Sequence, residues 1–294
     1  MYDWLTENKL PLGRGMKFLM DLLTGHARGF FDAVSWLLGA FIDGMTGLLL
    51  AAPPVVAIVV TAAGAFALHR SISLAVFVLV SLGLVVNLGY WEATMQTLSL
   101  VLSSTFVCVL AGVPLGIAAA HRPWFYKLLR PVLDLMQTIP TFVYLIPTLV
   151  LFGLGSVPGL VATVIFALPA PVRLTHLGIS SVPTALHDAA LAFGATRRQL
   201  LYKVELPHAL PTIMAGVTQC IMLSLSMVVI AALVGADGLG KPVVRALNSV
   251  NVATGFEAGT AIVILAIILD RVLRRPEPAK QDGPARSESA GLPR

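Results

Sequence analysis

Charged side chains are scarce in this sequence: Asp, Glu, Lys and Arg make up 12% of its 294 residues. A water-soluble domain carries about 25% of these residues. Hydrophobic residues account for 57%, and the mean hydropathy is +0.86. This composition excludes an ordinary soluble domain and predicts an integral membrane protein. The net charge of +5 arises from basic residues between apolar segments, so it indicates membrane orientation rather than nucleic-acid binding.

The sequence contains only two cysteines. Their spacing is not that of a metal site or a disulfide framework. Cys108 and Cys220 both fall inside apolar segments, which favours small buried residues. The six histidines show no paired ligand spacing, and no Ser/His/Asp arrangement stands out. Residues 235–242 nearly match a phosphate-binding loop, but Pro242 replaces the hydroxyl that binds Mg²⁺. We therefore expect no enzyme, metal or cofactor site on this chain.

Long apolar runs dominate what is present. A helix needs about 20 apolar residues to cross the bilayer core, and about seven runs approach that length. Residues 47–92 are interpreted as two accessory transmembrane helices, and residues 93–275 as the functional core. We therefore expect an all-α membrane protein with spans at 47–68, 72–89, 96–120, 131–152, 157–175, 211–235 and 257–273.

Residues 1–46 differ from this pattern. The beginning is polar, and from Met16 to about Met45 apolar and charged side chains take different faces of a helix, as Phe30 and Asp32 illustrate. We expect this amphipathic helix to be too charged to span. It can lie along the membrane interface or pack on the protein's own spans, and the sequence leaves both open.

Basic residues give the chain an orientation. They concentrate in the loops around 121–130 and 196–203, whereas the connectors at 90–95 and 153–156 carry neither Lys nor Arg. The positive-inside rule then places the N-terminus outside and the C-terminus in the cytoplasm, although the basic residues of the N-terminal tail run against this count. The tail at 276–294, rich in Pro, Ser, Gly and charge, is expected to be disordered.

Ionisable residues are missing from the middle of every expected span. Ion-coupled carriers usually bind or relay the coupling ion through such a group. The energy for transport is therefore expected to enter from elsewhere. A self-sufficient secondary carrier or channel remains the alternative from another functional class.

Two spans carry neutral polar residues that can line a translocation pathway. Pro140 is expected to kink the helix over 131–152 and to free the carbonyl of Met136. In the span 211–235, polar residues recur at seven-residue spacing and share one face. Such faces either form hydrogen bonds between helices or line a pathway. The pathway hypothesis names Gln137, Thr138, Pro140, Thr141, Tyr144, Gln219 and Ser226.

The interval 181–207 is the one long stretch of the C-terminal half that is too polar for lipid. A short helix fits Pro183 to Phe193, with Ser181 as its N-cap. Gly194 can take the left-handed backbone that closes a helix.

A second short helix follows the glycine. Thr196 opens it, because Gln199 stands at the spacing of a capping box. Pro207 is expected to end it. The interval therefore predicts helix, glycine turn and helix, held against a membrane.

The residue pattern of this interval is more specific than its shape. Asp188-Ala189-Ala190, three residues, Gly194, nine residues and Val204-Glu205-Leu206-Pro207 resemble the cytoplasmic EAA loop of ABC importer permeases, which reads E-A-A, three residues, G, nine residues, I-x-L-P. Asp replaces Glu and Val replaces Ile here. Small alanines let a helix settle into a groove, and Phe193 offers an anchor. The predicted coupling residues are Asp188, Ala189, Ala190, Phe193, Gly194, Leu206 and Pro207.

Further segments resemble one branch of these permeases, the one for glycine betaine, proline betaine and choline. They are residues 133–145, 172–175, 225–231 and 264–271. The resemblance implies a type I importer permease core in the bacterial plasma (inner) membrane, with a second permease copy forming a homodimer. It also implies cytoplasmic ATPase subunits that bind ATP and Mg²⁺ and dock at 181–207, and an extracytoplasmic binding protein. A permease of the same architecture for an amino acid or a sulfonate stays an alternative.

Overall fold

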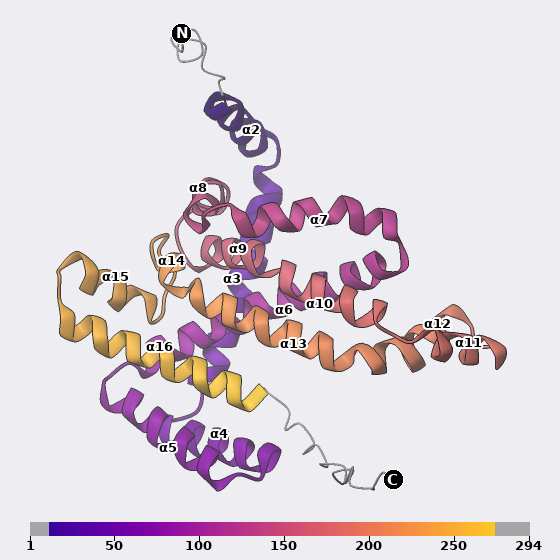
Figure 1. The fold of residues 1–294 in the computed structure, drawn as a ribbon. Coiled ribbons are helices and arrows are strands. Elements are labelled where there is room, and N and C mark those ends of the chain that lie inside the picture. Colours follow the sequence, from indigo (N-terminus) through magenta and orange to yellow (C-terminus); the bar gives the residue numbers. More distant parts are fainter. Residues whose placement is uncertain (1–11, 274–294) are drawn as a thin grey trace, which may run out of the picture.

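The computed structural model describes residues 12–273, and within this range every regular element is a helix. The expected disordered tail and residues 1–11 of the polar N-terminus lie outside the described residues. Figure 1 shows long helices packed side by side, with one helical hairpin extending beyond them at one end. The predicted all-α architecture is therefore confirmed for the described part of the chain.

The lead-in consists of α2 (Leu12–His26) and α3 (Arg28–Leu50). α3 is long and apolar enough to cross a membrane, whereas charge was expected to keep this segment from spanning. Its ionisable residues are too few and too far apart to interrupt the apolar stretch. In Figure 1, however, α3 runs across the direction of α13 (Leu206–Ser226) and α16 (Val252–Leu273). Its location at the membrane interface stays a prediction.

Two consecutive prolines separate α3 from the next helix. Pro53 has extended backbone, and Pro54 begins α4 (Pro54–His69), which turns back into α5 (Ile72–Asn87). The expected span 47–68 is thus divided, because a proline disfavours helical backbone at the residue before it. α4 and α5 form an apolar core with α16. Each has 16 residues, which is about 24 Å of helix.

The centre of the fold is α6 (Trp91–His121), packed against α9 (Ser156–Ala167), α10 (Pro169–Ser180) and α13. Glycine permits the close contact between α6 and α10. A Cβ atom on Gly112 would lie 2.9 Å from the ring of Pro171. α9 and α10 together make one apolar segment of 25 residues, so the span expected at 157–175 continues five residues further.

The span expected at 131–152 is broken rather than kinked. α7 (Pro123–Thr138) and α8 (Thr141–Phe152) meet at 97°. Ile139, the residue before Pro140, has extended backbone (φ −67°, ψ 130°), as the proline ring requires of its predecessor. One proline therefore ends one helix and begins the next, where a kink within a continuous helix was expected.

The span expected at 211–235 also ends early, at Ser226. The short helix α14 (Val228–Ala232) and a turn with positive φ at Gly235 and Gly238 lead to α15 (Gly240–Asn248). Leu239 N–H donates to the Thr97 hydroxyl at 2.8 Å, which holds this turn on α6.

Fewer spans result than expected. Among the described residues, five helical segments are long and apolar enough to cross a membrane, or six if the bent pair α7–α8 is one span. α4 and α5 fall short of that length. The difference from the seven expected spans therefore lies in this criterion of length, because sequence hydropathy does not register where a turn shortens a helix.

Candidate functional site

The hairpin that follows α10 contains the predicted coupling residues. It consists of α11 (Thr184–Ala192), α12 (Arg197–Leu200) and the π-helical turn η1 (Leu201–Glu205), which continues directly into α13. Figure 1 shows it at the end of the helix bundle opposite α15. The predicted order of helix, turn and helix is confirmed.

The turn between the two short helices has the predicted chemistry. Gly194 has φ +76°, and its N–H donates to Leu191 O at 2.9 Å. Thr196 and Gln199 form the capping box: Gln199 N–H donates to Thr196 Oγ1 at 3.3 Å, and Thr196 N–H donates to Gln199 Oε1 at 2.8 Å. These local signals suffice to stop one helix and start another.

Two predicted helix ends are wrong. Pro183, with extended backbone, precedes α11 and no side chain caps it, whereas Ser181 ends α10 and donates to Gly178 O at 2.9 Å. Pro207 lies in the first turn of α13 and does not end the helix. The preceding turn is π-helical, with Leu206 N–H bonded to Leu201 O. Its wider backbone relieves the clash that a proline ring meets in a regular helix.

The hairpin presents apolar side chains to the outside. Phe193 is 92% exposed, and Leu186 and Leu191 are about half exposed. Asp188 and Ala189 are exposed beside them, and Ala190 is half-buried. Scattered exposed apolar residues are ordinary, but a phenylalanine at the tip of a hairpin is typical of a contact surface.

Sequence reasoning missed a buried contact at the base of the hairpin, centred on Glu205. Its side chain is 3% exposed, and His121 Nε2 lies 2.8 Å from Glu205 Oε2. His187 Nε2 lies 3.3 Å from the other carboxylate oxygen, Oε1. The three residues come from η1, the last residue of α6 and α11. Nothing in their spacing along the chain indicated this contact, because only the folded hairpin brings them together.

The predicted pathway residues around Pro140 lie at the elbow between α7 and α8. The Tyr144 hydroxyl donates to Leu135 O at 3.1 Å, and the Thr138 hydroxyl reaches the same oxygen at 3.4 Å. Gln137 and Thr141 are half-buried, and Pro140 is exposed. Two of the polar groups thus satisfy the backbone at the helix break. The carbonyl of Met136 was expected to be free for hydrogen bonding. Instead, the carbonyl oxygen of Leu135 accepts the hydrogen bonds from Thr138 and Tyr144.

The second pathway group lies on α13. Gln219 and Ser226 are both exposed, and the Ser226 hydroxyl donates to Met222 O at 3.1 Å. Within residues 12–273 no hydrogen bond or ion pair joins this face to the elbow. Tyr144 of the elbow packs in one apolar cluster with Met227, the residue that follows Ser226.

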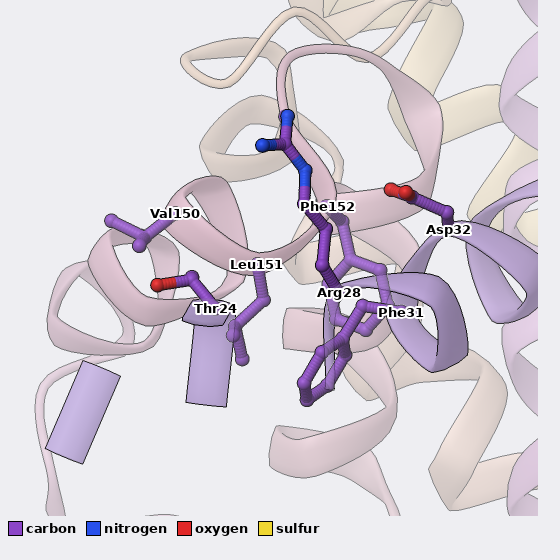
Figure 2. A pocket seen from close by; sticks show the side chains of 8 residues that line it. Thr24, Arg28, Phe31, Asp32, Val150, Leu151 and Phe152 are labelled. Atoms are coloured by element: carbon purple, nitrogen blue, oxygen red, sulfur yellow. The ribbon is translucent and has the colours of Figure 1, made fainter. Parts of the chain in front are cut away.

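A cavity of about 420 Å³ lies elsewhere, between the lead-in helices and the end of α8. In Figure 2, Phe31 and Phe152 lie together at its wall, and Arg28 and Asp32 extend from α3 beside them. The two rings make an edge contact with centroids 5.6 Å apart. None of the predicted pathway residues lines this cavity.

Long apolar helices that pack closely at glycines, with one exposed hairpin at the end of the bundle, define a multispan membrane protein. The chain belongs to the family described as the binding-protein-dependent transport system inner membrane component, whose model matches residues 112–279. It is a transport permease and not an enzyme, and the predicted membership in the ABC importer permeases is confirmed.

Two relatives match about nine-tenths of the chain. The glycine betaine transport system permease protein OpuAB of Bacillus subtilis is 46% identical over 264 residues, which cover 90% of this chain and 93% of the relative. The glycine betaine/proline betaine permease protein ProW of Escherichia coli is 46% identical over 270 residues, covering 92% of this chain and 76% of the relative.

A solved structure shares the fold. A chain of the MetNI methionine ABC transporter, in an inward-facing conformation, superposes with a TM-score of 0.55 at 26% identity, covering 60% of this chain and 91% of that chain. The type I importer permease fold that was predicted from the sequence is thereby confirmed.

Proposed function

We propose that this chain is the permease subunit of an ATP-driven importer for quaternary-amine osmolytes: glycine betaine, proline betaine or choline. It passes solute from an extracytoplasmic binding protein to the cytoplasm. The observation that carries the proposal is the exposed hairpin with Asp188, Ala189, Ala190 and Gly194 at EAA spacing. Relatives named for glycine betaine, 46% identical over nine-tenths of the chain, support the substrate class.

The hairpin is the proposed docking site for the ATPase subunits, which bind ATP and Mg²⁺ themselves. Ala189 and Ala190 add no bulk to α11, so this helix can approach a groove closely. Phe193, 92% exposed, has nearly its whole ring available for burial in that groove, which can contribute about 2 kcal/mol or more. The left-handed Gly194 keeps the ring at the tip.

The orientation follows from the same hairpin. Arg197, Arg198 and Lys203 are exposed on it, and cytoplasmic loops are the ones enriched in basic residues. α16 runs from the end near α15 back toward the end that carries the hairpin (Figure 1). A cytoplasmic hairpin therefore supports a cytoplasmic C-terminus in the inner membrane.

The translocation pathway is proposed to run between two copies of the chain. Gln219 and Ser226 face outward from α13, and an uncovered amide in lipid is unfavourable. A second copy would cover this face, so that polar groups from both chains border a shared path. Thr141 and Tyr144 at the elbow of α7 and α8 are proposed as further contacts for the solute.

Reconstitution in liposomes tests this function. The permease, its ATPase subunits and its binding protein are expected to import radiolabelled glycine betaine only with ATP inside. Unlabelled proline betaine or choline should compete, and methionine or taurine should not. Competition by methionine or taurine alone would instead support the amino acid or sulfonate alternative. Uptake by the permease alone in ATP-free liposomes would establish a secondary carrier and overturn the proposal.

A further inference from the structure

Among the described residues, Glu205 is the one carboxylate whose side chain is almost completely buried. Burial of a carboxylate is unfavourable unless hydrogen-bond donors satisfy it. His121 supplies such a donor at 2.8 Å. It is the last residue of α6, so this contact lies at the end of that helix. The carboxylate therefore fixes the end of α6 to the beginning of α13.

The π-helical turn determines where the Glu205 side chain lies. η1 contains one residue more than a regular helical turn and ends at Glu205. One extra residue rotates everything before it by about 100° relative to the helix that follows. α12 and α13 are thus continuous along one helix axis, but their side chains are rotated relative to each other about that axis. π-helical turns of this kind are frequent at functional sites.

The contact with α11 is incomplete. His187 Nε2 lies 3.3 Å from Glu205 Oε1, yet this buried atom makes no hydrogen bond of acceptable geometry. The two observations agree if the imidazole lies beside the carboxylate and its N–H bond is not directed at the carboxylate oxygen. A small rotation or displacement of α11 would align the donor. His187 directly precedes Asp188, the first residue of the coupling pattern.

We propose that Glu205 is a positioning residue that connects α11 to α6 and α13, so that movement of α11 on the ATPase is transmitted to the membrane helices. This inference rests on the proposed function. One carboxylate oxygen holds His121 at the end of α6, and the other faces His187 of α11. Without this carboxylate, α11 can follow the ATPase while the core helices do not.

The test measures the solute imported per ATP hydrolysed by the complete transporter in liposomes, with radiolabelled glycine betaine. Glu205→Ala is expected to lower this ratio about tenfold, the value of one lost charge-assisted hydrogen bond, while the ATPase still co-purifies. Glu205→Gln should lower the ratio less than Glu205→Ala does, because the glutamine amide oxygen can still accept a hydrogen bond from His121. The double variant Glu205→Ala/His187→Ala should be no worse than Glu205→Ala alone, since both remove the same contact.

His187→Ala keeps the inference testable if Glu205→Ala does not assemble, because His187 lies on the half-exposed face of α11. It should also lower the ratio. His208→Ala, an exposed histidine, and Glu92→Ala, an exposed carboxylate at the far end of α6, should leave the ratio unchanged. An unchanged ratio in His187→Ala, or in an assembled Glu205→Ala, overturns the inference. Absence of ATP-dependent uptake by the unaltered transporter would instead overturn the proposed function.

Discussion

A methyl group on Gly116 of α6 would lie 2.6 Å from the Cβ atom of Thr175 on α10. Real Cβ atoms do not approach other atoms so closely, and the backbone oxygen of Val172 would lie at 2.7 Å on the same side. The hydrogen on Gly116 therefore sets the separation of α6 and α10. This pair of helices connects the centre of the bundle to the hairpin, since α10 leads directly into it.

Gly116→Ala is expected to destabilise the protein, by about 1–3 kcal/mol if α6 and α10 separate slightly to admit the methyl group. The measurement is the melting temperature of the purified permease in detergent. Gly83→Ala in α5 is the matched control, because a Cβ atom there meets nothing within 4 Å. Equal melting temperatures for both variants would contradict the close contact.

Gly194→Val is expected to weaken ATPase binding about tenfold, measured by co-purification, while the permease still inserts. The neighbourhood of Gly194 is open, so the effect comes from its φ of +76°, which is unfavourable for an L-residue by about 1–2 kcal/mol. Gly194→Asn should retain binding, because asparagine tolerates left-handed backbone. Loss of binding in the asparagine variant as well would show that φ is not the cause.

Phe193→Ala is expected to weaken ATPase binding by about 2 kcal/mol, as for a buried aromatic anchor, without lowering the stability of the permease alone. The side chain is 92% exposed in this chain, so its removal leaves no cavity. Binding of the ATPase to permease in nanodiscs gives the affinity. Phe256→Ala, another highly exposed phenylalanine at the beginning of α16, should bind normally, and equal weakening there would refute a specific anchor.

Tyr144→Leu is expected to raise the glycine betaine concentration for half-maximal uptake, if the ring meets the quaternary ammonium by a cation–π contact of about 0.5–2 kcal/mol. Tyr144→Phe keeps the ring and removes only the hydrogen bond to Leu135 O, so it should change this concentration little. Phe256→Leu, an exposed aromatic residue at the beginning of α16, serves as control. A large effect of the phenylalanine variant would assign Tyr144 a structural role at the elbow.

Local chemistry explains what the sequence predicted correctly. Gly194 and the Thr196–Gln199 capping box act within a few residues of each other, so their geometry follows from residue type. The EAA spacing at 188–207 located the hairpin through its resemblance to a family pattern. The roles of the coupling residues in ATPase docking stay predictions.

Contacts between distant segments explain what the sequence could not predict. Glu205 and His121 are 84 positions apart, and a glutamate in a polar loop indicates an exposed side chain. Pro140 indicated a bend, but whether a proline kinks or breaks a helix depends on what packs on each half. Pro207 does not end a helix, because the π-helical turn before it accommodates the proline ring. No residue type in the sequence predicts such a turn.

The shortness of α4 and α5 has a consequence for the surrounding lipid. Two adjacent helices of about 24 Å cannot match a hydrocarbon layer of about 30 Å, so any bilayer that they cross must thin along this edge of the protein. Each ångström of mismatch is unfavourable by a fraction of a kcal/mol. The acyl-chain length of the lipids is therefore expected to affect this permease through α4 and α5. The mismatch at these two helices is largest in thick membranes.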